Sequence, residues 1–274
     1  MPEKIDLVLS GSGTLAPCHI GAYAYLVREA GMVVERVSGT SGGAIVAAGI
    51  AHNMTISQMS ALAAETLSSN VLDPIPWWRP WEFLNGYGVH RFAKAHAIIT
   101  NSLPGQLDQA FLEWGVWAVD LEVRQPVWIH SKRDSHIRTA DAVLASASIP
   151  VFAQARDIRG MKGLFVDGGA AVNFGMDVWD DMPERRTIGI RFKGRDGGRR
   201  PVGNVVQFAY AVAQTFMNAA NHTHISRKRY QDVIQVESQA NGLDFNQTQE
   251  QVDQMFNEGF QAAKRWHQSA SSDP

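Results

Sequence analysis

The sequence predicts an α/β protein with a mainly parallel sheet between helices. An apolar run, Leu7–Leu9, ends in a glycine-rich turn and is followed by a helical stretch, Ile20–Ala30. A second apolar stretch, Met32–Val37, leads through another glycine-rich turn into a run of small residues, Gly43–Ala51. Alternation of this kind continues to about Ala64 and is typical of successive parallel β-α units.

The first glycine-rich turn, Gly11-Ser12-Gly13, exposes backbone N–H groups ahead of a helix. Such groups can hold either a dinucleotide pyrophosphate or the oxyanion of an acyl-transfer intermediate. The spacing Gly11-x-Gly13-x-x-Ala16, followed by Glu35, approximates a dinucleotide fingerprint. However, Glu35 lies before or within the second strand, whereas a ribose carboxylate belongs at the C-terminal end of that strand. This favours the oxyanion interpretation.

The second turn, Gly39-Thr40-Ser41-Gly42-Gly43, has the G-x-S-x-G form of a nucleophile elbow. A serine on a sharp strand-to-helix turn is pushed out of the sheet, and flanking glycines allow the strand and helix to approach closely. The N-terminus of the following helix also favours negative charge on the serine oxygen. The motif alone leaves an ordinary glycine turn as an alternative.

A third element, Gly163–Val166, reads as an apolar strand that ends in Asp167-Gly168-Gly169. An aspartate at this position is delivered to the edge of the sheet where open α/β folds place their sites. The alternative is a turn aspartate that hydrogen-bonds its own backbone. Taken with the two glycine-rich turns, Asp167 favours a serine hydrolase whose base is an aspartate.

With these motifs, the chain resembles the patatin-like phospholipase family of the bacterial type. The resemblance covers nearly the whole chain and is carried by Leu7–Leu26, Gly39–Gly43, Ala145–Pro150, Asp167–Gly169 with Asn173, Ile234–Glu237 and Gly242–Phe245. It implies a three-layer α/β/α fold and a Ser-Asp dyad, without histidine, that cleaves fatty-acyl esters of lipids. By this resemblance Ser41 is the nucleophile and Asp167 is the base, and no cofactor or metal is required.

The oxyanion loop departs from the family pattern. The candidate donors to an oxyanion are the N–H groups of Gly11, Ser12, Gly13 and Gly42. Ser12 replaces a glycine, Leu15 and Ala16 replace an arginine and a glycine, and Gly175 stands where a proline is common. Ser12 keeps its N–H, so the hole survives if the loop tolerates a Cβ. A binding or scaffold protein that kept the fold and lost catalysis is the competing class.

Several polar side chains near these motifs have alternative roles. His222 and His224 follow Asp167 and give the Ser, Asp, His order of ordinary α/β-hydrolases, although here the nucleophile comes after only the second strand. His19 is expected to be a structural donor. Ser146 and Ser148 are expected to serve in packing or capping.

Residues 70–105 are expected to form a tryptophan- and proline-rich insertion. Its prolines exclude a long regular helix, so Trp77, Trp78 and Trp81 lie on a loop or short turns. These indoles form either the private core of a lid or an exposed surface that enters a lipid interface. By contrast, Phe111, Trp114 and Trp117 occur at helical spacing within Leu107–Ala118 and are expected to be core residues of a helix.

Composition agrees with one α/β domain over residues 1–274. The 274 residues are 45% hydrophobic and carry a net charge of −2, which gives no attraction to nucleic acid. The lone Cys18 suits a reducing compartment. Neither a signal peptide nor an apolar run near the ~18 residues of a membrane span is present, so we expect a cytoplasmic protein, with peripheral membrane contact through the insertion as an option. No zinc-type ligand spacing occurs.

The final helix is expected to begin at a capping box formed by Thr248 and Gln251. One face is apolar and most simply covers a side of the sheet, with a membrane-binding helix as the alternative. The tail, residues 269–274, is expected to be disordered.

Overall fold

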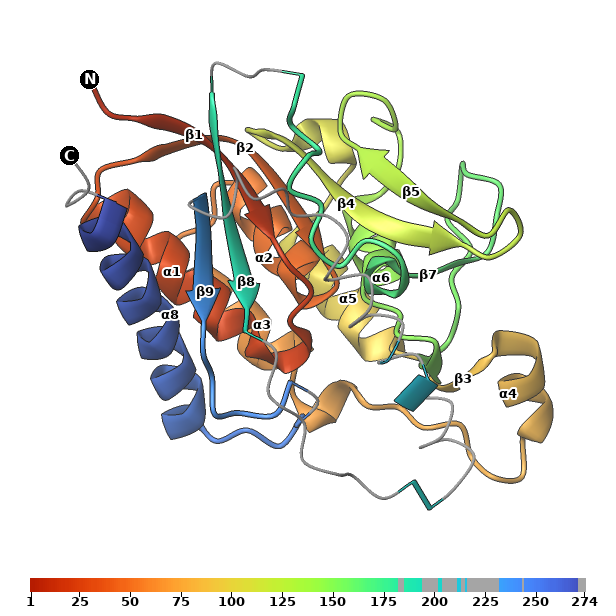
Figure 1. The fold of residues 1–274 in the computed structure, drawn as a ribbon. Helices are drawn as coiled ribbons and strands as arrows, with labels where there is room; N and C mark the ends of the chain where they lie inside the picture. The colour runs from red at the N-terminus through yellow and green to blue at the C-terminus, as the bar shows by residue number, and fades with distance from the viewer. Residues whose placement is uncertain are drawn as a thin grey trace.

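A mainly parallel sheet forms the centre of the molecule (Figure 1). The computed structural model describes residues 1–181, 185–193, 202–203, 211–212, 215, 232–242 and 244–270. The strands of this sheet, in the order β5-β4-β2-β1-β8-β9 with β7 also paired to β4, are β1 (Lys4–Leu9), β2 (Val33–Thr40), β4 (Glu113–Asp120), β5 (Gln125–His130), β7 (Phe165–Asp167), β8 (Arg186–Phe192) and β9 (Val233–Val236). Among these described strands, only β5 and β7 pair antiparallel, both with β4. The predicted α/β class with a mainly parallel sheet is confirmed.

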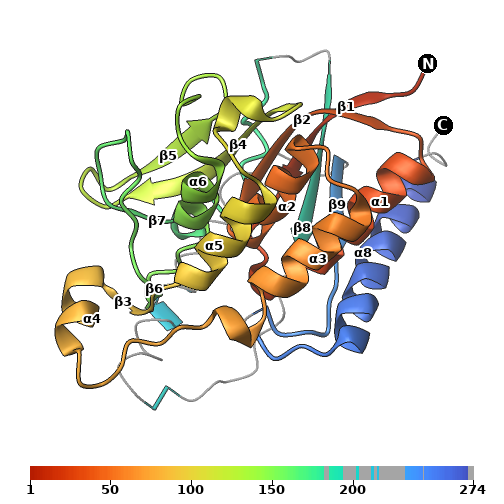
Figure 2. The same ribbon diagram turned by 180° about the vertical axis from the view of Figure 1, so that it is seen from behind.

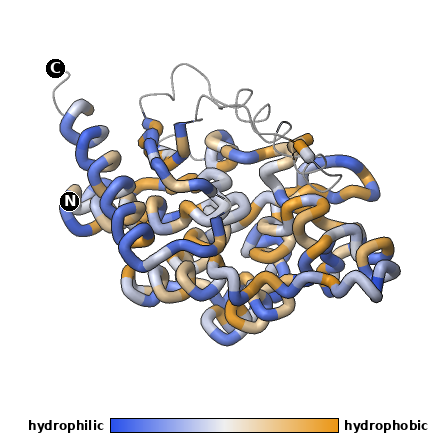
Figure 3. Tube along the Cα trace, turned by 90° about the horizontal axis from the view of Figure 1, so that it is seen from below, coloured by the Kyte–Doolittle hydropathy of each residue, from blue (hydrophilic) through white to orange (hydrophobic). Residues whose placement is uncertain are grey.

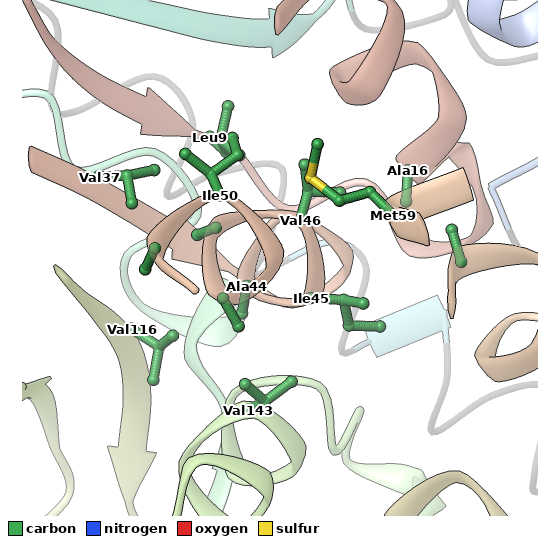
Figure 4. Close-up of a cluster of buried hydrophobic side chains, with 14 of the residues drawn as sticks. Leu9, Ala16, Val37, Ala44, Ile45, Val46, Ile50, Met59, Val116 and Val143 are labelled. Carbon is green, nitrogen blue, oxygen red and sulfur yellow. The ribbon is translucent and has the colours of Figure 1, made fainter. Parts of the chain in front are cut away.

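Six described helices form a layer that Figure 2 shows in front of the sheet: α1 (Ala16–Arg28), α2 (Gly42–Ala51), α3 (Ile56–Thr66), α5 (Ala93–Ser102), α6 (Thr139–Ser146) and α8 (Gln249–Ala270). All residues of α2 are buried, which explains its composition of small and aliphatic side chains without a polar face. Figure 4 shows α2 surrounded by Leu9, Val37, Val116, Met59 and Val143 from three strands and two further helices. Each fully buried aliphatic side chain contributes ~1.5–3 kcal/mol, so this packing fixes the helix that starts directly after Ser41.

The segment from Leu107 to Ala118 is not a helix, so that prediction is wrong. A short 3-10 turn, η3 (Leu107–Gln109), precedes β4, which pairs with both β2 and β5. Trp114 is buried and donates from Nε1 to the carbonyl oxygen of Leu107 at 3.1 Å, but Phe111 is 77% exposed. Sheet pairing on both sides, with aromatic and β-branched residues that suit a strand, overrides the helical spacing.

The tryptophan-rich insertion contains α4 (Pro80–Gly86) and β3 (Gly88–His90), which pairs with β6 (Val151–Ala153) in a separate small sheet. In Figures 1 and 2, α4 projects at the margin of the molecule, beyond the carboxyl ends of the parallel strands. Trp77, Trp78 and Trp81 are 86%, 61% and 53% exposed. They therefore do not form a private core, and that alternative is wrong.

The last described helix, α8, starts as predicted. The Thr248 N–H donates to Gln251 Oε1 at 2.8 Å, and the Gln251 N–H donates to Thr248 Oγ1 at 3.3 Å. Figure 3 shows α8 as largely hydrophilic, and its buried positions, which include Met255 and Ala263, pack against α1. Positions 269 and 270 belong to this helix rather than to a disordered tail, and positions 271–274 lie outside the described residues. None of the helices described here is long and apolar enough to cross a membrane.

Candidate active site

Ser41 occupies a strained turn between β2 and α2. Its φ of 55° and ψ of −124° lie in a region that non-glycine residues rarely adopt. A Cβ on Gly39 would clash with the carbonyl oxygen of Gly43, and one on Gly43 would clash with that of Ser10. Glycine at both positions is therefore what lets α2 pack directly against β1 and β2, as the nucleophile-elbow motif predicts.

Strand pairing brings Asp167 to Ser41. On one side of β4, Trp117 pairs with Thr40, the residue before Ser41; the next residue of β4, Ala118, pairs with Asp167 of the antiparallel β7. The Ser41 hydroxyl donates to Asp167 Oδ2 at 2.6 Å. Asp167 is delivered to the expected edge of the sheet, but by an antiparallel strand.

Burial raises the pKa of the Asp167 carboxyl to about 7, opposed by hydrogen bonds from Ser41 and from the backbone of Gly169. The Gly169 N–H donates to Oδ1 at 2.7 Å, so each carboxylate oxygen has one donor. The carboxyl is fully buried. A base with a pKa near neutrality accepts a proton readily and is still substantially ionised at pH 7.

The oxyanion loop is held by a segment from late in the sequence. Gly13 has a φ of +54°, and a Cβ there would clash with the carbonyl oxygen of Gly242. That oxygen accepts the N–H of Thr14 at 2.9 Å. Ser12 has a φ of −136°, which any residue adopts, so the loop tolerates the serine that replaces a glycine. The contact with Gly242 is not predictable from the sequence pattern, because it joins segments more than 200 residues apart.

Gly11 must be removed from the predicted set of oxyanion donors. Its N–H donates to the carbonyl oxygen of Asn173 at 2.9 Å and is therefore already bonded. By contrast, the N–H groups of Ser12, Gly13 and Gly42 have no acceptor within the described part of the chain. These three remain candidate donors.

His19 has the structural role that the sequence predicted. It is buried, and its Nε2 lies 2.9 Å from the carbonyl oxygen of Ser10, just before the oxyanion loop. Burial lowers the pKa of His19 to about 4, so the ring is neutral at pH 7 and donates from Nε2. No histidine in the described ranges hydrogen-bonds Ser41 or Asp167, and His222 and His224 lie outside those ranges.

Sequence reasoning missed the contact that Ser146 makes with Ser41. Its Oγ accepts the backbone N–H of Ser41 at 3.0 Å, although Ser146 was expected to serve only in packing or capping. Ser148 matches that expectation more closely, because its hydroxyl donates to the carbonyl oxygen of Leu144 at 2.6 Å. A serine in a run of alanines is a weak signal, since only the fold shows which backbone it faces.

An apolar pocket opens beside Ser41. It encloses about 480 Å³ of empty space, part of it open to solvent. Apart from Ser41 and Thr66, every lining residue is apolar or glycine, and the Thr66 hydroxyl is bonded to the carbonyl oxygen of Leu62. The lining residues are Gly13, Ser41, Gly42, Ile45, Thr66, Leu67, Phe92, Ala95, Ile99, Leu144, Ala147, Ile149, Phe152 and Phe245. Such a pocket suits a hydrocarbon chain.

The chain is similar to bacterial proteins over most of its length. The uncharacterized protein YqhO of Bacillus subtilis is 28% identical over 251 residues, which cover 84% of this chain and 86% of YqhO. The uncharacterized NTE family protein Rv2565 of Mycobacterium tuberculosis is 31% identical over 178 residues, which cover 64% of this chain but only 28% of that relative.

Solved structures share the fold at low sequence identity. VipD from Legionella pneumophila has a TM-score of 0.61 at 14% identity, covering 98% of this chain and 67% of VipD. The type III effector ExoU of Pseudomonas aeruginosa has a TM-score of 0.53 at 14% identity, covering 99% of this chain and 54% of ExoU.

A family model adds the decisive match. The model described as patatin-like phospholipase covers residues 7–179, which include the oxyanion loop, the elbow and the Asp167 motif. The chain therefore belongs to the patatin-like phospholipase family.

Proposed function

We propose that this protein is a serine lipid acyl hydrolase of the phospholipase A type that uses Ser41 and Asp167 as a catalytic dyad. The observation that carries the proposal is the 2.6 Å hydrogen bond between Ser41 Oγ and Asp167 Oδ2 beside an apolar pocket. Membership of the patatin-like phospholipase family supports the same substrate class.

In the proposed first step, ionised Asp167 accepts the hydroxyl proton as Ser41 Oγ attacks the ester carbonyl carbon of a bound acyl lipid. The tetrahedral oxyanion is stabilised by the N–H groups of Ser12, Gly13 and Gly42. Collapse of this intermediate breaks the bond to the leaving alcohol, which takes the proton from Asp167. An acyl-enzyme on Ser41 results.

In the second step, Asp167 accepts a proton from a water molecule that attacks the acyl-enzyme. The same N–H groups stabilise the second oxyanion, and the fatty acid leaves as Ser41 regains its proton. The acyl chain occupies the apolar pocket throughout, so binding energy from that chain positions the ester next to Ser41.

The direct Ser41–Asp167 hydrogen bond supports a dyad over a Ser-Asp-His triad, because a triad places the imidazole between the serine and the carboxylate. The open N–H groups of the oxyanion loop likewise support catalysis over a purely binding role. Leu15, which replaces the usual arginine, packs against the core.

We further propose that the surface formed by Trp77, Trp78, Trp81, Phe83, Leu84 and Tyr87, here called the aromatic patch, contacts the lipid interface during catalysis. All six side chains are exposed. Indole and phenol rings are stable at the level of lipid head groups. The pocket-lining Phe92 follows β3 and Phe152 lies on its partner β6, so the aromatic patch adjoins the pocket along the chain.

Substitution of the nucleophile tests the proposal. Ser41→Ala is expected to abolish hydrolysis of a chromogenic short-chain ester and of phospholipid vesicles, with circular dichroism and the unfolding midpoint close to wild type. A folded Ser41→Ala variant that retains activity would sink the mechanism. An inactive wild-type protein would instead favour the scaffold alternative.

A further inference from the structure

The backbone of the nucleophile is held by a side chain from another element. Ser41 follows the last ladder pair of β2 and precedes the first turn of α2, so its N–H has no partner in either element. Ser146, the last residue of α6, is fully buried, and its Oγ accepts this N–H at 3.0 Å. A buried N–H without an acceptor is costly, and Ser41 also has a strained φ of 55°. Ser146 therefore stabilises the conformation that presents Ser41 Oγ.

The backbone of the base is held by the same short stretch of chain. The carbonyl oxygen of Ser148 accepts the N–H of Asp167 at 2.9 Å. Only Ala147, which lines the pocket, separates the two serines. One tripeptide thus attaches to the nucleophile at one end and to the base at the other, which fixes the distance between their backbones.

We propose that Ser146 is a positioning residue that keeps Ser41 Oγ within hydrogen-bonding reach of Asp167. This inference rests on the proposed function, because it requires Ser41 to be the nucleophile. Ser146 acts through the N–H of Ser41 and touches no reacting atom. Since a misplacement of about 1 Å can slow a reaction ~10²-fold, we expect Ser146→Ala to lower kcat by about tenfold to a hundredfold. KM should change little, because the pocket keeps its lining.

Ser131 provides a matched control. It is buried, and its Oγ also accepts a backbone N–H, that of Trp114, at 3.0 Å. Ser131→Ala therefore removes the same kind of hydrogen bond from the interior without contact to Ser41, Asp167 or the pocket lining. We expect both variants to lower the unfolding midpoint, and only Ser146→Ala to lower kcat.

The pH profile gives a readout that a purely structural role would not move. The hydrogen bond from Ser41 lowers the pKa of Asp167 against the effect of burial. If Ser146→Ala loosens that bond, the midpoint of the pH–rate profile should move to higher pH, and it should stay in place in Ser131→Ala.

The experiment measures kcat, KM, the pH midpoint and the rate of Ser41 labelling by a fluorophosphonate for wild type, Ser41→Ala, Ser131→Ala and Ser146→Ala. The proposal predicts that kcat and the labelling rate fall in parallel in Ser146→Ala. Both should stay close to wild type in Ser131→Ala. Wild-type kcat and labelling in a folded Ser146→Ala would overturn it. If that variant does not fold, Ser146→Cys, which fills the site with a slightly larger side chain but is a weak acceptor, is judged by the same criteria. Activity in Ser41→Ala would overturn the proposed function itself.

Discussion

The dyad and the aromatic patch differ in which side chains they bury and which they expose. At the dyad, Ser41 and Asp167 are buried polar groups, and each has a defined hydrogen-bond partner. In the aromatic patch, large apolar rings are exposed. Trp77 and Trp78 pack edge to face, with their ring centroids 5.8 Å apart. Both arrangements carry a free-energy cost in water, since one desolvates a carboxylate and the other hydrates indoles.

The difference suggests a division of labour. The cost at the dyad is the desolvation that raises the pKa of Asp167, which suits the role of base that we propose for it. On our proposal, the cost in the aromatic patch is recovered when the rings leave water for a lipid interface. If this is correct, changes at the dyad should affect every substrate, and changes in the aromatic patch should affect only aggregated lipid.

The strongest test of the dyad is Asp167→Asn. Asparagine keeps the shape of the side chain but removes the base, so kcat should fall by about 10²-fold or more on both soluble ester and vesicles. Mutation of His222 and His224 together to alanine should leave most of the rate. A mild effect of Asp167→Asn combined with an inactive double variant would establish the triad instead.

The pH dependence tests the dyad without mutation. Because Asp167 must be ionised to accept a proton, and burial raises its pKa to about 7, activity should fall as the pH is lowered through that value. Two pH units below it, about 1% of the carboxyl is ionised, so kcat/KM should be about 10²-fold lower. A profile on soluble ester that stays flat down to the ordinary range of aspartate would contradict the proposed base.

Replacement of Trp77, Trp78 and Trp81 by alanine tests the aromatic patch. An indole buries roughly 200 Å², and at ~25 cal/mol per Å² even partial insertion of two rings should change vesicle partitioning by about tenfold or more. Vesicle binding and long-chain phospholipid hydrolysis should weaken, while hydrolysis of a soluble ester is spared. Phe111→Ala, at a 77% exposed aromatic outside the aromatic patch, is the control. An equal loss of activity on vesicles and on soluble ester would contradict the separate roles proposed for the dyad and the aromatic patch.

A smaller effect is expected inside the pocket. Ala95 is the buried alanine of α5 that lines it, so Ala95→Phe should shorten the space for the acyl chain. Each methylene excluded is worth ~0.8 kcal/mol, or about fourfold in kcat/KM. A series of esters of increasing chain length should show lost preference for long chains and unchanged turnover of short ones. Ala97→Phe, on the exposed face of the same helix, should leave the series unchanged.

Local motifs allowed most of the dyad to be predicted from the sequence. Gly39, Ser41 and Gly43 are close in the chain, so their spacing, read together with the apolar strand before them and the helical run after them, predicts the turn that the structure contains. Asp167 could be placed at the sheet edge because it ends an apolar strand. The direction of β7 could not be predicted, because it depends on pairing with β4, which lies about 50 residues earlier in the chain. Such long-range pairing outweighs the local preference of the residues.

The predictions that the structure contradicts also failed because of contacts between distant parts of the chain. Trp114 and Trp117 are spaced as on a helix, but neighbours on both sides of β4 make that segment a strand. The Gly11 N–H fails as a predicted oxyanion donor because it donates to the carbonyl oxygen of Asn173, a contact that the sequence does not show. The sequence leaves two alternatives open for Trp77, because composition does not show what an irregular segment packs against.

The contacts around Gly13 have a consequence for the order of events during synthesis. The hydrogen bond from Thr14 Oγ1 to the carbonyl oxygen of Asn241, 3.2 Å long, joins residues 227 positions apart, and Gln247 also donates to Thr14 Oγ1 at 3.0 Å. A ribosome-bound chain therefore carries its nucleophile long before its oxyanion loop can be ordered. We expect nascent chains stalled before Asn241 to resist fluorophosphonate labelling, because they lack the residues that hold Thr14 beside the oxyanion loop.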